Sequence, residues 1–124
     1  MKVYFLAWLV LMSLLALGHA EGDDKKQSHS VTWGARVFRD THLERVVISE
    51  KSRFLRVVTR DYKFKQQSNL KRKITQIVIT DQIKEGKGGY AHLRGGGPSA
   101  SFAEIHFKSQ RNRGFSFIVD IYGI

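Results

Sequence analysis

The sequence predicts an all-β protein, with a single small antiparallel β-sandwich or barrel-like domain after a cleaved signal peptide. Three observations support this prediction. Apolar and polar residues alternate with a period of two in the C-terminal half, as in half-buried strands. Turn-forming residues separate these runs at the spacing typical of sandwiches and barrels. No segment shows the periodicity of an amphipathic helix. The predicted organisation is a signal peptide at 1–20, a disordered polar arm at 21–30 and the all-β domain at 31–124.

The first twenty residues have the pattern of a secretory signal peptide. Lys2 precedes an apolar run at 3–17, and Gly18 and Ala20 supply small residues at the −3 and −1 positions of a cleavage site. A membrane anchor is the alternative, but a spanning helix needs about 20 apolar residues, and this run is shorter. We therefore expect a secreted, extracellular protein, without integral membrane association after cleavage. The next ten residues, EGDDKKQSHS, are polar throughout, which predicts the disordered arm.

The strands follow from the alternation. Residues 115–122 are the clearest example, because Phe115, Phe117, Val119 and Ile121 fall on one face of the strand. Residues 101–108 alternate in the same way, and the β-branched run at 74–81 fits a central strand. Further strands are expected at 31–33, 43–49, 55–64 and 90–94. Segments rich in glycine, asparagine or proline are placed where hairpins would need them, at 84–89, 95–98 and 110–114.

The glycine-rich stretch EGKGGYAHLRGGGPSA, at 85–100, raises the question of a phosphate cradle. The Walker pattern fails because Lys87 is followed by Gly88. The dinucleotide pattern is met formally, but it requires a helix next, and the three glycines at 95–97 cannot sustain one. We interpret the stretch as two glycine turns around a short strand, and we expect no cofactor.

No catalytic or metal-binding residues are predicted. The absence of cysteine excludes disulfides, thiol catalysis and zinc-thiolate sites. A zinc site would have to combine His92 and His106 with a carboxylate such as Glu104. Because Glu104 and His106 alternate with Ile105, an exposed polar face is the favoured interpretation. The nucleophile elbow G-x-S-x-G is also absent. We therefore expect that the protein is not an enzyme.

The positive charge is concentrated in one stretch. The chain has a formal net charge of +10, and residues 51–73 hold nine basic residues and one acid, a net +8. In RFLRVVTRDYKFK, at 53–65, aromatic and arginine residues would share one strand face. They could stack bases and hold phosphates, or bind a sulfated sugar or another anionic surface. The alternative is an edge strand kept soluble by its charges. The candidate anion-binding residues are Arg53, Arg56, Arg60, Lys63, Lys65, Lys71, Arg72 and Lys73.

The C-terminal half also resembles a known family. The segments ITQIVITDQ, GKGGYAHLRGGGP and FKSQRNRGFSFIVDIYG resemble, in this order, the insect salivary secreted peptide family. That family is grouped with multiprotein bridging factor 2, a transcription co-activator. The resemblance implies a small, β-rich, cysteine-poor secreted domain without enzymatic activity, and it implies that the glycine segments are fixed turns. The sequence RNRG at 111–114 departs from the R-G-H-G common among relatives.

These observations lead to one main hypothesis and two alternatives. The main hypothesis is a secreted binding or effector protein of saliva, venom or haemolymph, monomeric or weakly associating. Its basic stretch would bind an anionic polymer or an acidic protein surface. The first alternative is a co-activator that bridges a DNA-bound factor to the general transcription machinery, which the cluster at 71–73 permits but the signal peptide opposes. The second is a cationic host-defence protein that acts on membranes, for which no amphipathic helix is available.

Overall fold

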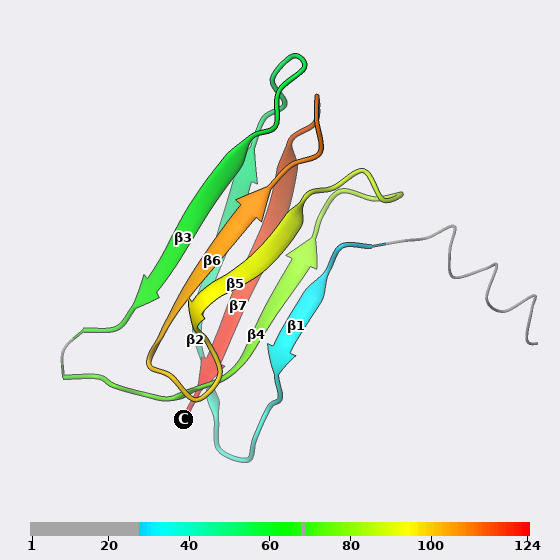
Figure 1. Ribbon diagram of the computed structural model, residues 1–124. Coiled ribbons are helices and arrows are strands. Elements are labelled where there is room, and N and C mark those ends of the chain that lie inside the picture. Colours follow the sequence, from blue (N-terminus) through cyan, green and yellow to red (C-terminus); the bar gives the residue numbers. More distant parts are fainter. Residues whose placement is uncertain (1–27, 68) are drawn as a thin grey trace, which may run out of the picture.

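The computed structural model describes residues 28–67 and 69–124, which form seven strands (Figure 1). The predicted signal peptide and most of the predicted polar arm lie outside the described residues. The described part contains no helix, so no helix there could cross a bilayer. The strands are β1 (Val31–Gly34), β2 (Thr41–Glu50), β3 (Thr59–Lys65), β4 (Ile74–Asp81), β5 (Tyr90–Gly96), β6 (Phe102–Lys108) and β7 (Phe115–Gly123).

The strands form two antiparallel sheets. One sheet has the order β1-β4-β7-β2 and the other the order β3-β6-β5. Every neighbouring pair in both sheets is antiparallel. The sheets pack face to face, as Figure 1 shows, so the architecture is an open sandwich and not a closed barrel. The predicted all-β class is confirmed.

The core lies between the sheets and is a cluster of buried apolar side chains. Strand β7 contributes its alternate residues, since Phe115, Phe117, Val119 and Ile121 are buried as the alternation predicts. Phe107 of β6 meets this strand from the opposite sheet, with its ring centroid 5.2 Å from that of Phe117. Because the chain has no cysteine, burial of these side chains must stabilise the fold without a covalent link between the sheets.

Two of the three expected hairpin turns connect different sheets. Only the β5–β6 connection joins strands that pair with each other. The β4–β5 and β6–β7 connections cross from one sheet to the other, so the hairpin prediction for 84–89 and 110–114 was wrong. Turn residues report the local backbone conformation, and this conformation does not reveal whether the chain returns to the same sheet.

The predicted strand boundaries hold to within two residues except in β3. This strand begins at Thr59 instead of residue 55. Leu55 has a φ of 57°, in the left-handed region, which is incompatible with an extended strand. The four residues before Thr59 therefore belong to a loop, although their sequence has strand character.

The glycine-rich stretch forms turns and strand β5, as predicted. In the first turn, the backbone carbonyls of Gly86 and Gly88 accept hydrogen bonds from the Gln110 side chain, at 2.7 and 2.9 Å. A Cβ at Gly88 would touch the carboxylate of Asp81. These carbonyl oxygens and the carboxylate carry negative charge, which disfavours a phosphate at this position. The first group of glycines therefore allows close packing of the chain.

Two glycines in the second group provide a matched test of the turn. Gly96 has a φ of 61° and a Cβ there would collide with the backbone carbonyl of Phe102, whereas a Cβ at Gly95 would lie 3.5 Å from Glu104. We expect Gly96→Ala to lower the free energy of unfolding by about 1–3 kcal/mol, because alanine is strained at this backbone conformation. Gly95→Ala should change it by less than about 1 kcal/mol. Urea denaturation of both variants checks this, and equal effects would contradict the assigned turn geometry.

Candidate anion-binding site

Two loops at one end of the sandwich carry a cluster of cations. They are the β2–β3 loop, residues 51–58, and the β6–β7 loop, residues 109–114, which lie together at the upper end in Figure 1. We call these two loops the basic tip. They contain five basic residues and no acid: Lys51, Arg53, Arg56, Arg111 and Arg113. All five are exposed, and none forms an ion pair within the described residues.

Hydrogen bonds between the loops fix the shape of the basic tip. The Leu55 N–H donates to Oδ1 of Asn112 at 3.0 Å, and the Asn112 N–H donates to the carbonyl of Arg56 at 2.9 Å. Nη1 of Arg111 donates to the Leu55 carbonyl at 2.9 Å. Asn112 itself has a φ of 66°, which asparagine tolerates better than most residues. Both backbone polar groups of Leu55 are therefore satisfied by the neighbouring loop.

A second set of contacts anchors the basic tip to the core. The Val58 N–H donates to the Ser109 hydroxyl at 2.8 Å, and the Ser109 N–H donates to the Val58 carbonyl at 2.8 Å. Both residues are buried. The loops thus leave the sandwich from a shared, hydrogen-bonded base, which restricts their motion relative to the sheets.

A pocket of about 340 Å³ opens at the side of the basic tip. Arg53 and Arg56 line it, together with the start of β3. Glu50 also lines it, and its carboxylate is 3.7 Å from a guanidinium nitrogen of Arg60. Two arginines of the pocket therefore remain available to an anion, while Arg60 has an acidic neighbour.

The predicted ligand-stacking face of β3 is instead a core face, which corrects the sequence interpretation. Val58 and Phe64 are buried against the other sheet, and Tyr62 is half-buried beside them. Burial, with a smaller effect from Glu44, raises the pKa of Tyr62. These side chains cannot stack on bases. The alternation of side chains along β3 was recognised correctly. The face that turns inward was wrongly assigned to the solvent, because arginines precede the strand and lie near its start.

Lys63 and Lys65 lie on the opposite, outward face of β3. The Lys63 ammonium is 3.7 Å from the carboxylate of Glu104 on the adjacent strand. Lys65 is exposed at the end of β3. These lysines therefore cover the outer surface of the three-stranded sheet and are not part of the basic tip.

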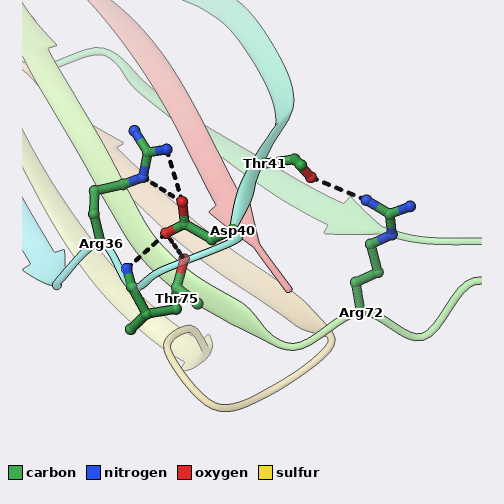
Figure 2. Close-up of polar contacts among 6 residues, drawn as sticks. Arg36, Asp40, Thr41, Arg72 and Thr75 are labelled. Carbon is green, nitrogen blue, oxygen red and sulfur yellow. Dashed lines mark hydrogen bonds and ion pairs between the residues drawn. The ribbon is translucent and has the colours of Figure 1, made fainter.

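The cluster of Lys71, Arg72 and Lys73 lies at the far end of the sandwich. It belongs to the β3–β4 loop, at the lower end in Figure 1. The seven residues of β3 separate it from the basic tip, a distance of about 23 Å for an extended strand. Arg72 donates from Nη1 to the Thr41 hydroxyl at 2.9 Å (Figure 2). The basic stretch of the sequence is thus divided between two ends and one face of the molecule.

An ion pair near this far end is shown in Figure 2. Arg36 contacts the Asp40 carboxylate at 2.7 Å, and the Thr75 hydroxyl donates to the same carboxylate at 2.9 Å. The hydrogen bond from Arg36 is the main reason that the pKa of Asp40 falls to about 2. The carboxylate closes the β1–β2 loop, so its role is structural.

The other ionisable clusters are also occupied by internal contacts. His106 contacts Asp61 at 2.6 Å, and within residues 28–67 and 69–124 no three metal-ligating side chains converge. Asp120, on the outward face of β7, is only 6% exposed. It accepts hydrogen bonds from Arg45 at 2.7 Å and interacts with His42 at 2.8 Å; the bond to Arg45 is the main cause of its lowered pKa.

Sequence reasoning did not select Lys51 as a candidate, and it missed the contribution of the β6–β7 loop to the basic tip entirely. Arg111, Asn112 and Arg113 are 55 or more positions from Arg56, so no local pattern connects them to it. The available signal was the pair of arginines around an asparagine in a predicted turn. That signal indicates a basic loop, but it does not show that this loop packs beside the β2–β3 loop.

The fold and the site define a small, cysteine-free β-sandwich protein with a cationic loop end. The chain belongs to the family described as transcription activator MBF2, whose model matches residues 33–123. It is also similar to a probable salivary secreted peptide of Bombus ignitus, with 32% identity over 106 residues, covering 86% of this chain and 78% of the relative. No solved structure matches. Both resemblances noted in the sequence are therefore confirmed.

The contact between Asn112 and Leu55 gives a direct test of the basic tip. Asn112→Gly suits the positive φ but removes the acceptor of the Leu55 N–H, so we expect hydrogen exchange at Leu55 to accelerate roughly tenfold. Asn112→Asp retains an acceptor oxygen and serves as the control, with slow exchange preserved. Amide exchange followed by NMR measures both. Unchanged exchange in Asn112→Gly would show that the loops are not joined in this way.

Proposed function

We propose that this chain is a secreted, non-enzymatic binding protein that engages an anionic partner through its basic tip. The observation that carries the proposal is the set of five exposed cations on two loops without an acid. Such a cluster produces a local positive potential that attracts anions and accelerates their association.

The fixed geometry of the loops supports a binding role. The hydrogen bonds of Leu55 and Asn112 hold the backbone that carries the cations in place before a partner arrives. A preformed site loses less conformational entropy on binding than a flexible one, so more of the interaction energy contributes to affinity. The cluster at 71–73 is a secondary candidate for anion binding. One of its three cations, Arg72, already donates a hydrogen bond to the Thr41 hydroxyl.

The proposal that the protein is not an enzyme rests on the assignment of its ionisable groups. The histidine–carboxylate pairs lie on the outer faces of the sheets, between neighbouring strands. Asp120 is held by Arg45 as well as by His42. We assign these pairs to the stabilisation of the sheets.

Secretion is supported by two independent lines. The relative from Bombus ignitus is named a salivary secreted peptide. The first twenty residues have the basic, apolar and small-residue regions of a signal peptide. A cysteine-free core is compatible with an oxidising extracellular space, because no thiol is available to react there.

The description of the family supports a second candidate function, transcription co-activation. In that role the basic tip would contact an acidic protein surface, and the protein would have to reach the nucleus. The two candidates differ in cellular location, which makes them separable by experiment.

Matched charge removal tests the basic tip. We expect Arg53→Gln, Arg56→Gln and Arg113→Gln together to cause earlier elution from a heparin column and a weaker salt dependence of binding. The control removes the same charge at the far end, by Lys71→Gln, Arg72→Gln and Lys73→Gln, and should retain most of the affinity. Equal losses in both variants, or no retention of the wild-type protein at low salt, would refute the proposed site.

The N-terminus of the product tests secretion. After expression of the full-length chain in insect cells, we expect protein in the medium that begins at Glu21, because the signal peptidase would cleave after Ala20. N-terminal sequencing provides the measurement. Uncleaved protein in the nucleus would contradict secretion and favour co-activation.

A further inference from the structure

We infer that the basic tip docks on the surface of an anionic lipid bilayer, with Phe54 and Leu55 entering the boundary between headgroups and acyl chains. The inference rests on the proposed function and specifies its partner. It concerns peripheral binding by loops, and it requires no spanning segment.

The β2–β3 loop of the basic tip exposes two large apolar residues. Phe54 is 82% exposed and Leu55 is 57% exposed. They are adjacent in the β2–β3 loop, and this loop extends beyond the end of the sandwich in Figure 1. Large apolar side chains exposed together at a protruding point indicate contact with an apolar partner.

The backbone at this point is strained and firmly held. Leu55 adopts a φ of 57° although it has a branched side chain. Asn112 and Arg111 satisfy its N–H and its carbonyl. Such strain persists only where the surroundings impose it, and it is concentrated at functional sites. Here it maintains a loop that leaves the Leu55 side chain in solvent.

The charges around this apolar pair match an anionic membrane. Arg53 and Arg56 flank Phe54 and Leu55 in the same loop. Arg111 and Arg113 lie in the adjoining loop, joined to the first by hydrogen bonds. Apolar groups bordered by arginines combine insertion at the interface with attraction to anionic headgroups. Neither loop contains an acidic residue, and the nearby carboxylate of Glu50, which lines the pocket, lies 3.7 Å from a guanidinium nitrogen of Arg60.

An anionic polymer accounts for only half of this surface. A sulfated polysaccharide would pair with the arginines but would leave Phe54 and Leu55 in water. A bilayer surface engages both kinds of side chain at once, which is why we favour it.

The opposite end of the molecule provides a contrast. Phe38 is 86% exposed in the β1–β2 loop, next to the exposed Val37. In that loop Arg36 is paired with Asp40 and its guanidinium lies 3.8 Å from the centre of the Tyr122 ring. Within that loop only Arg39 remains without an acidic partner among the described residues, while the cations at 71–73 belong to the neighbouring β3–β4 loop at the same end. Phe38 and Val37 therefore serve as a matched apolar control.

Co-sedimentation with lipid vesicles tests the inference. The full chain after signal cleavage is mixed with phosphatidylcholine vesicles, with or without about 30% phosphatidylserine, a composition that gives a negative surface potential. We expect binding only to the anionic vesicles. Phe54→Ala with Leu55→Gly should weaken it by roughly tenfold or more, because the inserted apolar surface is lost. Glycine also suits the backbone at position 55, which protects folding. Phe38→Ala with Val37→Ala should leave binding unchanged.

Heparin affinity separates failure of this inference from failure of the proposed function. The Phe54→Ala/Leu55→Gly variant should bind heparin as the wild type does, because its arginines remain. If the wild-type protein binds heparin but not anionic vesicles, the bilayer is refuted and an anionic polymer remains. If it binds neither at low salt, the proposed function itself is refuted.

A fluorescent probe gives a second readout that does not depend on loss of binding. In Phe54→Trp, the indole should shift its emission to shorter wavelength on phosphatidylserine vesicles and be quenched by brominated acyl chains. The wild-type protein, with Trp33 in β1, provides the background. An indole at position 54 that remains in water while the protein is bound would overturn the insertion of the basic tip.

Discussion

The contact of Phe107 with Phe115 and Phe117 is the interaction on which the rest of the structure depends. These rings come from different sheets, with centroid separations of 6.0 and 5.2 Å. No disulfide is available to join the sheets, so this packing holds them together. Since β6 and β7 are connected directly by residues 109–114, the same contact determines where this loop leaves the sandwich. The paired hydrogen bonds of Val58 and Ser109 then place the second loop beside it.

The division between core and surface explains why the candidate site lies on loops. In β7, the inward residues fill the core, while Asp120 on the outward face is held by Arg45 and His42. On the other sheet, His106 and Glu104 are similarly engaged by Asp61 and Lys63. Ion pairs across neighbouring strands thus occupy the outer faces, whereas the cations of the basic tip have no acidic partner among the described residues.

The sequence was sufficient to predict the fold class and most of the strands, because strand periodicity is a local property. Phe115 to Ile121 show it directly, and β4 is predicted with its observed bounds. The sheet to which each strand belongs was not predictable, since the crossover loops at 84–89 and 110–114 have ordinary turn composition. The start of β3 was missed because the strain at Leu55 depends on contacts with Asn112, which is distant in sequence.

The candidate site was predictable only in part, because contacts between loops that are distant in sequence assemble it. Arg53 and Arg56 were identified from the charged run, and they do belong to the basic tip. The run was nevertheless read as one strand face, whereas the start of β3 and its inward residues divide it into separate regions. Arg111 and Arg113 join Arg53 and Arg56 through tertiary contacts alone. Charge along the sequence therefore predicted an anionic partner, but the arrangement of the loops was needed to define the candidate site.

NMR mapping of an anion on the folded protein would locate the anion-binding surface. Isotope-labelled protein would be titrated with a heparin-derived hexasaccharide at low salt while amide chemical shifts are followed. The account predicts that the largest changes lie in residues 51–58 and 109–114, with little change at residues 71–73. Changes centred on residues 71–73, or spread evenly over both ends, would contradict the assignment of anion binding to the basic tip.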